Sequence, residues 1–170
     1  MANTYTLISS NVLGSAAASV TFSAIPSTYT DLVIRYSGRV NVASTNSVVL
    51  LTFNGTTTAS FVNIQGRGSS GTNTSITSGQ STMNIGLTNG NSTTSNTFSS
   101  AEVYFPNYAG SSVKPLSSFA VTEDNNTLAF CDARATLQNQ TTAINSITIT
   151  GGAGDFMTGS SFYLYGISKN

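Results

Sequence analysis

The stretch Asp31-Leu-Val-Ile-Arg-Tyr-Ser-Gly-Arg39 alternates between two kinds of side chain. One parity carries Leu32, Ile34 and Tyr36, and the other carries Val33, Arg35, Ser37 and Arg39. Successive side chains of a strand point to opposite faces of a sheet, so this period of two predicts a strand with one buried and one wet face. We expect Arg35 and Arg39 on the wet face, paired with acids on a neighbouring strand or on a partner subunit.

Outward from this strand, short runs of the same kind recur, separated by Gly, Asn, Pro or Ser. Residues 47–54 are apolar on both parities, which favours a central strand, and Asn54-Gly55 after them is typical of a hairpin turn. The nine other candidate strands are 5–9, 19–25, 61–65, 83–87, 98–105, 116–122, 127–135, 144–150 and 161–167. No segment has a helical period. Many short strands predict an all-β fold, with an antiparallel, jelly-roll-like β-sandwich of residues 1–170 as the first choice.

Residues 66–97 differ from the rest of the chain. They are rich in Gly, Ser, Thr and Asn, and their larger apolar residues are Ile76, Met83, Ile85 and Leu87. A structureless loop of this length is unusual in a compact domain. We therefore expect one or two exposed hairpins, around Ile76 and around residues 83–87.

Composition excludes several classes of function. Ser, Thr and Asn number 27, 26 and 17 among 170 residues, while charged residues make up 7% and the net charge is zero. Six dispersed cations do not supply the basic surface that nucleic-acid binding through phosphates requires. No apolar run approaches the roughly 20 residues that span a bilayer, and the first residues do not resemble a secretion signal. We expect neither nucleic acid nor membrane as a partner.

The sequence offers little for catalysis. Histidine is absent, which removes Ser-His-Asp, Cys-His and His-based metal sites. Glu102 and Glu123 are the most plausible carboxylates for a glycosidase, but Glu123-Asp124 precedes a predicted hairpin turn and Asp31 is expected to open its strand in solvent. Gly151-Gly152-Ala153-Gly154-Asp155 is interpreted as an inter-strand loop, with a calcium site at Asp155 as the weaker alternative. We predict no enzyme, no cofactor and no metal.

Cys131 belongs to a row of small residues at alternate positions, from Thr127 to Ala135, and is interpreted as a small core residue. No base near it in the sequence could activate it as a nucleophile. Asp132 and Arg134 share the opposite parity with Leu128 and Phe130, which favours a cross-strand ion pair. A single cysteine forms no intrachain disulfide.

Five tyrosines are candidates for stacking on sugars: Tyr29, Tyr104, Tyr108, Tyr163 and Tyr165. In Tyr163-Leu164-Tyr165 both rings point to one face of a strand. A core or inter-subunit surface is favoured there over a glycan platform.

Several stretches together resemble small structural proteins of tailed bacteriophages. They are residues 5–14, residues 20–26 leading to 29–35, residues 104–110, and the ending from Gly159 to Ile167. The resemblance covers nearly the whole chain and implies a non-enzymatic virion protein. The simplest role that the resemblance implies is that of a capsid decoration (cement) protein. Such a protein would be a homotrimer that binds the major capsid protein and is assembled in the host cytoplasm. The resemblance supplies no catalytic residue.

The composition favours the same role, because a chain with few long charged side chains has little to desolvate when it packs against identical copies. Partner contacts are expected at Arg35, Arg39, Tyr104 and Tyr108, with the two arginines pairing with a neighbouring strand or a capsid subunit. The alternative is a tail or head-fibre module that recognises host surface glycans, favoured by residues 66–97 and by exposed tyrosines.

Overall fold

The computed structural model describes residues 4–55, 59–67, 71–80, 82–125 and 129–168. These residues form twelve strands and no helix, as the all-β prediction requires. The strands are β1 Tyr5–Val12, β2 Ser19–Phe22, β3 Asp31–Ser37, β4 Asn46–Phe53, β5 Ala59–Arg67, β6 Gly71–Gln80, β7 Met83–Asn89, β8 Ser100–Phe105, β9 Lys114–Glu123, β10 Ala129–Gln138, β11 Ile147–Gly151 and β12 Ser161–Ile167. Nothing in this part of the chain is a helix that could cross a membrane.

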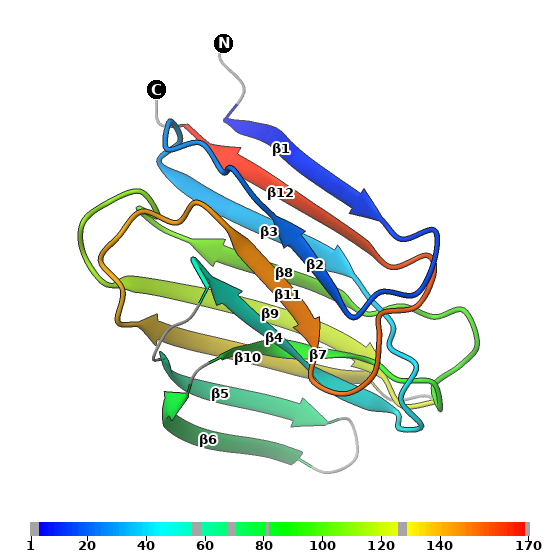
Figure 1. Ribbon diagram of the computed structural model, residues 1–170. Coiled ribbons are helices and arrows are strands. Elements are labelled where there is room, and N and C mark those ends of the chain that lie inside the picture. The colour runs from blue at the N-terminus through cyan, green and yellow to red at the C-terminus, as the bar shows by residue number, and fades with distance from the viewer. Residues whose placement is uncertain (1–3, 56–58, 68–70, 81, 126–128, 169–170) are drawn as a thin grey trace.

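The strands form two layers (Figure 1). One sheet has eight strands in the order β1-β12-β3-β8-β9-β10-β5-β6, and the other has four in the order β2-β11-β4-β7. Every strand pairing within the two sheets is antiparallel. The fold is thus the antiparallel, jelly-roll-like β-sandwich that the sequence predicts. Because eight strands face only four, β5 and β6 extend beyond β7, the last strand of the smaller sheet.

The core lies between the two sheets. Leu32, Ile34 and Tyr36 of β3 are buried there, which confirms the buried parity of the opening strand. The Tyr36 ring stacks on Phe162 with the ring centres 5.9 Å apart, and Phe162 meets Phe156 edge-on at 4.9 Å. Such aromatic pairs add to the free energy that burial alone provides.

Each of the eleven predicted strands overlaps a strand of the structure, although Thr127 and Leu128 lie outside the described residues. Residues 46–53 lie between β11 and β7, as the prediction of a central strand requires. Asn54 and Gly55 do have left-handed backbone angles, with φ of 53° and 96°. The predicted hairpin is nevertheless wrong, because β4 and β5 belong to different sheets.

The interpretation of residues 66–97 is only partly correct. Ile76 is 80% exposed, as predicted, and lies within β6, which pairs antiparallel with the preceding strand β5. Residues 83–87 form β7, where Met83, Ile85 and Leu87 are buried in or beside the core instead of exposed. The polar composition of this stretch therefore conceals one edge strand and one buried strand.

Candidate functional site: the outer face of the eight-stranded sheet

The outer face of the eight-stranded sheet consists of the side chains that point away from the four-stranded sheet. The strand register places one continuous row of them across six strands, because directly paired residues share a face. This row runs Tyr163, Arg35, Glu102, Phe119, Ala133, Ile64 from β12 to β5. A second row runs Leu7, Tyr165, Val33, Tyr104, Ser117, Ala135 from β1 to β10.

Exposed apolar side chains are concentrated on this face. Among the described residues, eight large apolar side chains are exposed, and by register seven of them point outward here. The seven are Tyr5, Leu7, Val12, Ile64, Ile76, Phe119 and Leu137. The eighth, Val113, lies just before β9. Scattered apolar residues are ordinary on protein surfaces, but a concentration on one face indicates an interaction surface.

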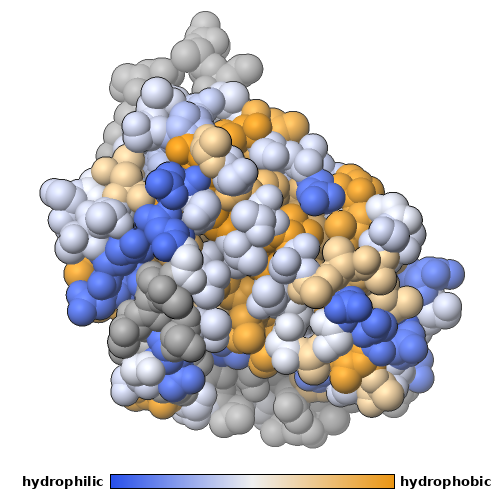
Figure 2. All heavy atoms as spheres, viewed as in Figure 1, coloured by the Kyte–Doolittle hydropathy of each residue, from blue (hydrophilic) through white to orange (hydrophobic). Residues whose placement is uncertain are grey.

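The opposite side of the molecule has a different character. Thr21, Thr148 and Thr52 form a row across β2, β11 and β4, and the hydroxyls of Thr21 and Thr148 lie 3.0 Å apart. Figure 2 shows this side, where residues of intermediate hydropathy (white) are interspersed with hydrophobic ones (orange). The two surfaces of the sandwich are therefore unequal, and the outer face of the larger sheet is the better candidate for binding.

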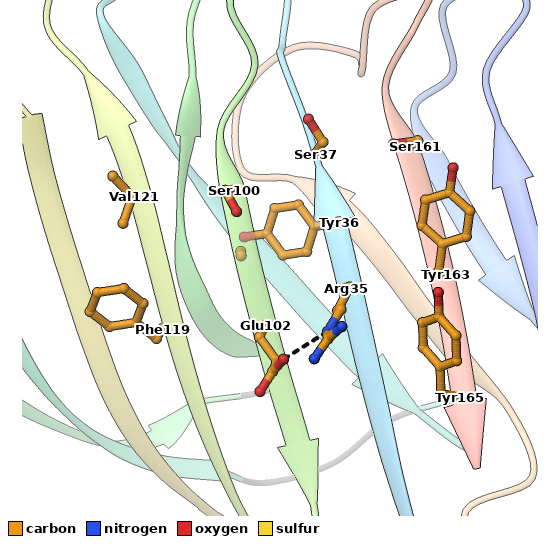
Figure 3. A pocket seen from close by; sticks show the side chains of 11 residues that line it. Arg35, Tyr36, Ser37, Ser100, Glu102, Phe119, Val121, Ser161, Tyr163 and Tyr165 are labelled. Carbon is orange, nitrogen blue, oxygen red and sulfur yellow. Dashed lines mark hydrogen bonds and ion pairs between the residues drawn. The ribbon is translucent and has the colours of Figure 1, made fainter. Parts of the chain in front are cut away.

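A groove of about 430 Å³ lies in the middle of the outer face, over β12, β3, β8 and β9. We call it the aromatic groove. Figure 3 shows Tyr163 and Tyr165 one after the other along β12, with their hydroxyls pointing the same way, and Phe119 on the far side. The remaining lining residues are Arg35, Tyr36, Ser37, Ser100, Ala101, Glu102, Val121 and Ser161.

An ion pair occupies the centre of this groove. The Arg35 Nε donates a hydrogen bond of 2.8 Å to Glu102 Oε2, and both side chains remain about half exposed, at 57% and 49%. The hydrogen bond that Arg35 donates to Glu102, and then the negative charge of Glu102, raise the pKa of Arg35. The Tyr5 ring lies 6.0 Å from the Arg35 guanidinium carbon. The Arg35–Glu102 ion pair confirms the predicted pairing of Arg35 with an acid on a neighbouring strand.

Arg39 does not share the wet face, so that prediction is wrong. β3 ends at Ser37, and Arg39 is only 4% exposed. Its guanidinium Nη1 donates to the Thr93 hydroxyl at 2.8 Å and to the Thr94 carbonyl at 2.7 Å, while Nη2 reaches the Asn91 carbonyl at 3.2 Å. Arg39 therefore holds the segment 91–97 in place and is not available to a partner.

The two tyrosines predicted as partner contacts have structural roles. Tyr108 is fully buried, and its hydroxyl donates to the Pro26 carbonyl, so it cannot meet a partner. Tyr104 is half-buried on the outer face and donates a hydrogen bond of 2.8 Å to Asp31. Asp31 is the first residue of β3, as predicted, but it is only 9% exposed and does not face solvent. Its second carboxylate oxygen accepts a hydrogen bond of 2.8 Å from the Asn107 N–H. The hydrogen bond to Asp31 raises the pKa of Tyr104.

The two faces of β10 are the reverse of the prediction. Cys131 is exposed on the outer face and is not a core residue. Asp132 and Arg134 point inward and are almost fully buried, with Arg134 Nε donating to Asp132 Oδ2 at 3.0 Å. They do form an ion pair, but within one strand and not across two strands. Burial of both charges together is tolerable because each neutralises the other.

The remaining acids show no arrangement for catalysis. Glu102 pairs with Arg35, and Glu123 accepts hydrogen bonds of 2.7 Å from both the Thr94 N–H and the Thr97 hydroxyl. The glycine-rich segment at 151–155 is a loop between strands, where Asp155 N–H donates to Asn41. No group of three His, Cys, Asp or Glu side chains that could hold a metal occurs in the described ranges.

Comparisons with known proteins identify no family for this chain. No family model matches it, and no curated protein matches it significantly. Among solved structures, the chain is similar to galectin LEC-6 of Caenorhabditis elegans, with 13% sequence identity and a TM-score of 0.37. That alignment covers 98% of this chain and 96% of the galectin chain.

Proposed function

We propose that this chain is a non-enzymatic structural protein of a bacteriophage virion, most simply a capsid decoration protein. In this proposal it binds its neighbours through the outer face of the eight-stranded sheet. The observation that carries the proposal is the concentration of seven of the eight exposed large apolar side chains on that face. Removing apolar surface from water contributes about 25 cal/mol per Å², and part of this offsets the entropy lost on association. The resemblance of the sequence to phage structural proteins supports the virion as the setting.

The half of the face over β9, β10 and β5 is the best suited to subunit contact. Phe119 and Leu137 are each about half exposed there, at 52% and 48%, and Ile64 at 54%. Between them, Ala133 and Ala135 present small side chains over which another surface can approach closely. The partners in this proposal are further copies of the chain, in a homotrimer, and the major capsid protein.

The experiment compares Phe119→Lys and Leu137→Lys with the control Val113→Lys. Val113 is also exposed and apolar, at 38%, but it precedes β9 and lies outside the paired strands of the face. Molar mass in solution is measured by light scattering, and occupancy is measured by co-sedimentation with capsids assembled without this chain. We expect a defined oligomer and capsid binding for the unmodified protein and for Val113→Lys. Both Lys variants on the face should lose these properties.

A second readout uses the single cysteine as a label. Cys131 lies on the same face and is exposed in the isolated chain. Assembly should protect it from a bulky maleimide, and labelling beforehand should block assembly. A protein that stays monomeric at high concentration and does not bind capsids would contradict the proposal. Equal loss in the Val113→Lys control would place the contact elsewhere.

A further inference from the structure

We propose that the aromatic groove is a binding site for a neutral saccharide. This inference goes beyond the assembly role and does not depend on it. The groove lies over β12, β3, β8 and β9, while the half of the face proposed for subunit contact lies over β9, β10 and β5, so the two surfaces share Phe119. Its volume of about 430 Å³ falls within the usual range for sites that hold a small ligand.

The walls of the groove suit the face of a sugar ring. Tyr163 and Tyr165 are half-buried on one wall, and Phe119 is 52% exposed on the other (Figure 3). The apolar C–H faces of a sugar ring can pack on aromatic rings of this kind. The two tyrosines are two residues apart on one strand, so their rings lie on the same face and form a continuous platform.

The polar groups of the groove suit the edge of a sugar ring. The Arg35 guanidinium and the Glu102 carboxylate are joined at 2.8 Å, yet both are about half exposed, so each retains hydrogen-bonding capacity toward a ligand. Ser37, Ser100 and Ser161 add hydroxyls along one end. Donors and acceptors that lie side by side match vicinal hydroxyl groups, which both donate and accept.

The charge of the groove argues against an ionic ligand. Arg35 and Glu102 are its charged lining residues, and they neutralise each other. A phosphate or carboxylate ligand would have to compete with Glu102 for the guanidinium, and a cationic ligand would have to compete with Arg35. A neutral, hydroxyl-rich ligand avoids this competition.

The position of the groove argues against a peptide. An extended peptide commonly binds by adding to the open edge of a sheet through backbone hydrogen bonds. β12, β3, β8 and β9 are all internal strands with a neighbour on each side. The groove therefore offers side chains only, which favours a ligand recognised by stacking and by hydroxyl contacts.

The test measures binding of short neutral oligosaccharides of glucose, galactose or mannose, with oligogalacturonate and oligoproline as competing ligand classes. Saturation-transfer NMR detects the contact, and calorimetry gives the affinity of the full chain. We expect at least one neutral oligosaccharide to bind, with Tyr163→Ala and Tyr165→Ala each weakening binding about tenfold. Tyr163→Phe, which keeps the ring, should retain most of the affinity.

Val113→Ala is the matched control, because Val113 is an exposed apolar residue that does not line the groove and is assigned to no contact surface. It should leave the affinity unchanged. Glu102→Gln should add affinity for oligogalacturonate, because Arg35 then lacks its anionic partner. Thermal unfolding of each variant separates lost binding from lost folding.

Three results would overturn the inference. The first is the absence of binding to every neutral sugar tested. The second is binding that persists when Tyr163 and Tyr165 are both replaced by Ala in a folded protein. The third is a preference of the unmodified protein for oligogalacturonate or oligoproline. None of these results bears on capsid binding, so failure here is distinguishable from failure of the assembly role.

Discussion

Arg35 and Arg39 lie four residues apart, but one makes a surface contact and the other makes an internal one. Arg35 meets Glu102 at 2.8 Å with more than half of its side chain exposed. The Arg39 side chain is enclosed, and its guanidinium donates to the carbonyls of Asn91, Thr93 and Thr94. The same residue type therefore contributes very differently to stability at the two positions.

Replacement of each arginine by alanine should reveal this difference. We expect Arg35→Ala to change the free energy of unfolding by less than about 1 kcal/mol, because exposed ion pairs contribute little. Arg39→Ala removes the guanidinium that donates to the carbonyls of Asn91, Thr93 and Thr94 and empties an enclosed site, so the loss should reach about 3 kcal/mol or more. Urea unfolding measures the free energy of unfolding of both variants, and the loss caused by Arg39→Lys should lie between the losses caused by Arg35→Ala and Arg39→Ala. Equal effects of the two alanine variants would refute the structural role of Arg39.

Gly86 in β7 should not tolerate a side chain. A Cβ there would lie 2.7 Å from the Ala120 Cβ, and its φ of 137° is unfavourable for other residues. We expect Gly86→Ala to cost about 1–3 kcal/mol in urea unfolding. Gly14→Ala is the control and should be nearly neutral, because nothing lies within 4 Å of its added Cβ.

A second variant separates the two causes at this position. Ala120→Gly removes the methyl group that a Cβ at Gly86 would meet. In the Ala120→Gly background, Gly86→Ala should therefore lower the free energy of unfolding by less than it does in the unmodified protein. The loss that remains is the cost of the backbone angle at residue 86. An unchanged cost would mean that the contact with Ala120 is unimportant.

The buried pair Asp132 and Arg134 should behave as one unit. Both side chains are nearly inaccessible, at 1% and 3% exposure. Asp132→Leu removes the carboxylate that neutralises the buried Arg134 and should cost about 3–5 kcal/mol, and Arg134→Met is the second single change. The double variant Asp132→Leu with Arg134→Met should cost clearly less than the sum of the two single changes. Additive losses in a double-mutant cycle would show that the pair is not coupled.

Glu123 should make stability depend on acid. Burial raises the pKa of Glu123, but hydrogen bonds from Thr97, Asn125 and Thr94 outweigh this effect and bring it below the ordinary value. Its contribution is thus complete above the ordinary pKa of about 4.3 and is lost as the pH falls through the lower, folded value.

The variant Glu123→Gln isolates this effect because it cannot ionise. We expect the thermal midpoint of the variant to lie a few degrees below that of the unmodified protein at neutral pH. The gap should shrink as the pH falls from the ordinary pKa of a glutamate through the lower, folded pKa of Glu123. Calorimetry across this range measures the gap, and a gap that is constant with pH would contradict the assigned hydrogen bonds.

Strand positions were largely predictable because alternation is a local property of the sequence. β6 was the exception: only Ile76 is a large apolar residue among its ten residues. Its strand conformation depends on pairing with β5, a tertiary effect that composition does not reveal. The prediction placed Arg39 on the wet face because it extended the alternation of β3 to residue 39. The strand ends at Ser37, so the alternation no longer applies there.

Which face of β10 points into the core could not be predicted from its own residues. One parity holds small apolar residues such as Cys131 and Ala133, and the other holds Asp132 and Arg134, so the usual rule puts the small residues inside. The structure reverses this because the two charges neutralise each other when buried. The inward face of β10 is fixed by its register with the neighbouring strands, and the sequence of β10 alone does not contain that register.

The aromatic groove depends even more on register. Tyr163, Arg35, Glu102 and Phe119 become neighbours only because four strands distant in the sequence align. The sequence singled out Tyr163 and Arg35 separately, and Phe119 was missed. The one available signal was that Phe119 and Val121 share the parity opposite to Leu116 and Ala120.

The pairing of β1 with β12 has a practical consequence. Ser168 N–H donates to the Thr4 carbonyl at 3.1 Å, so the first and last described residues lie together at the β1 edge (Figure 1). In the strand order this edge is the far end of the sheet from β10, β5 and β6. A fluorescent protein or displayed antigen fused to either terminus would leave the molecule at that edge, away from the half of the face over β9, β10 and β5 that is proposed for subunit contact.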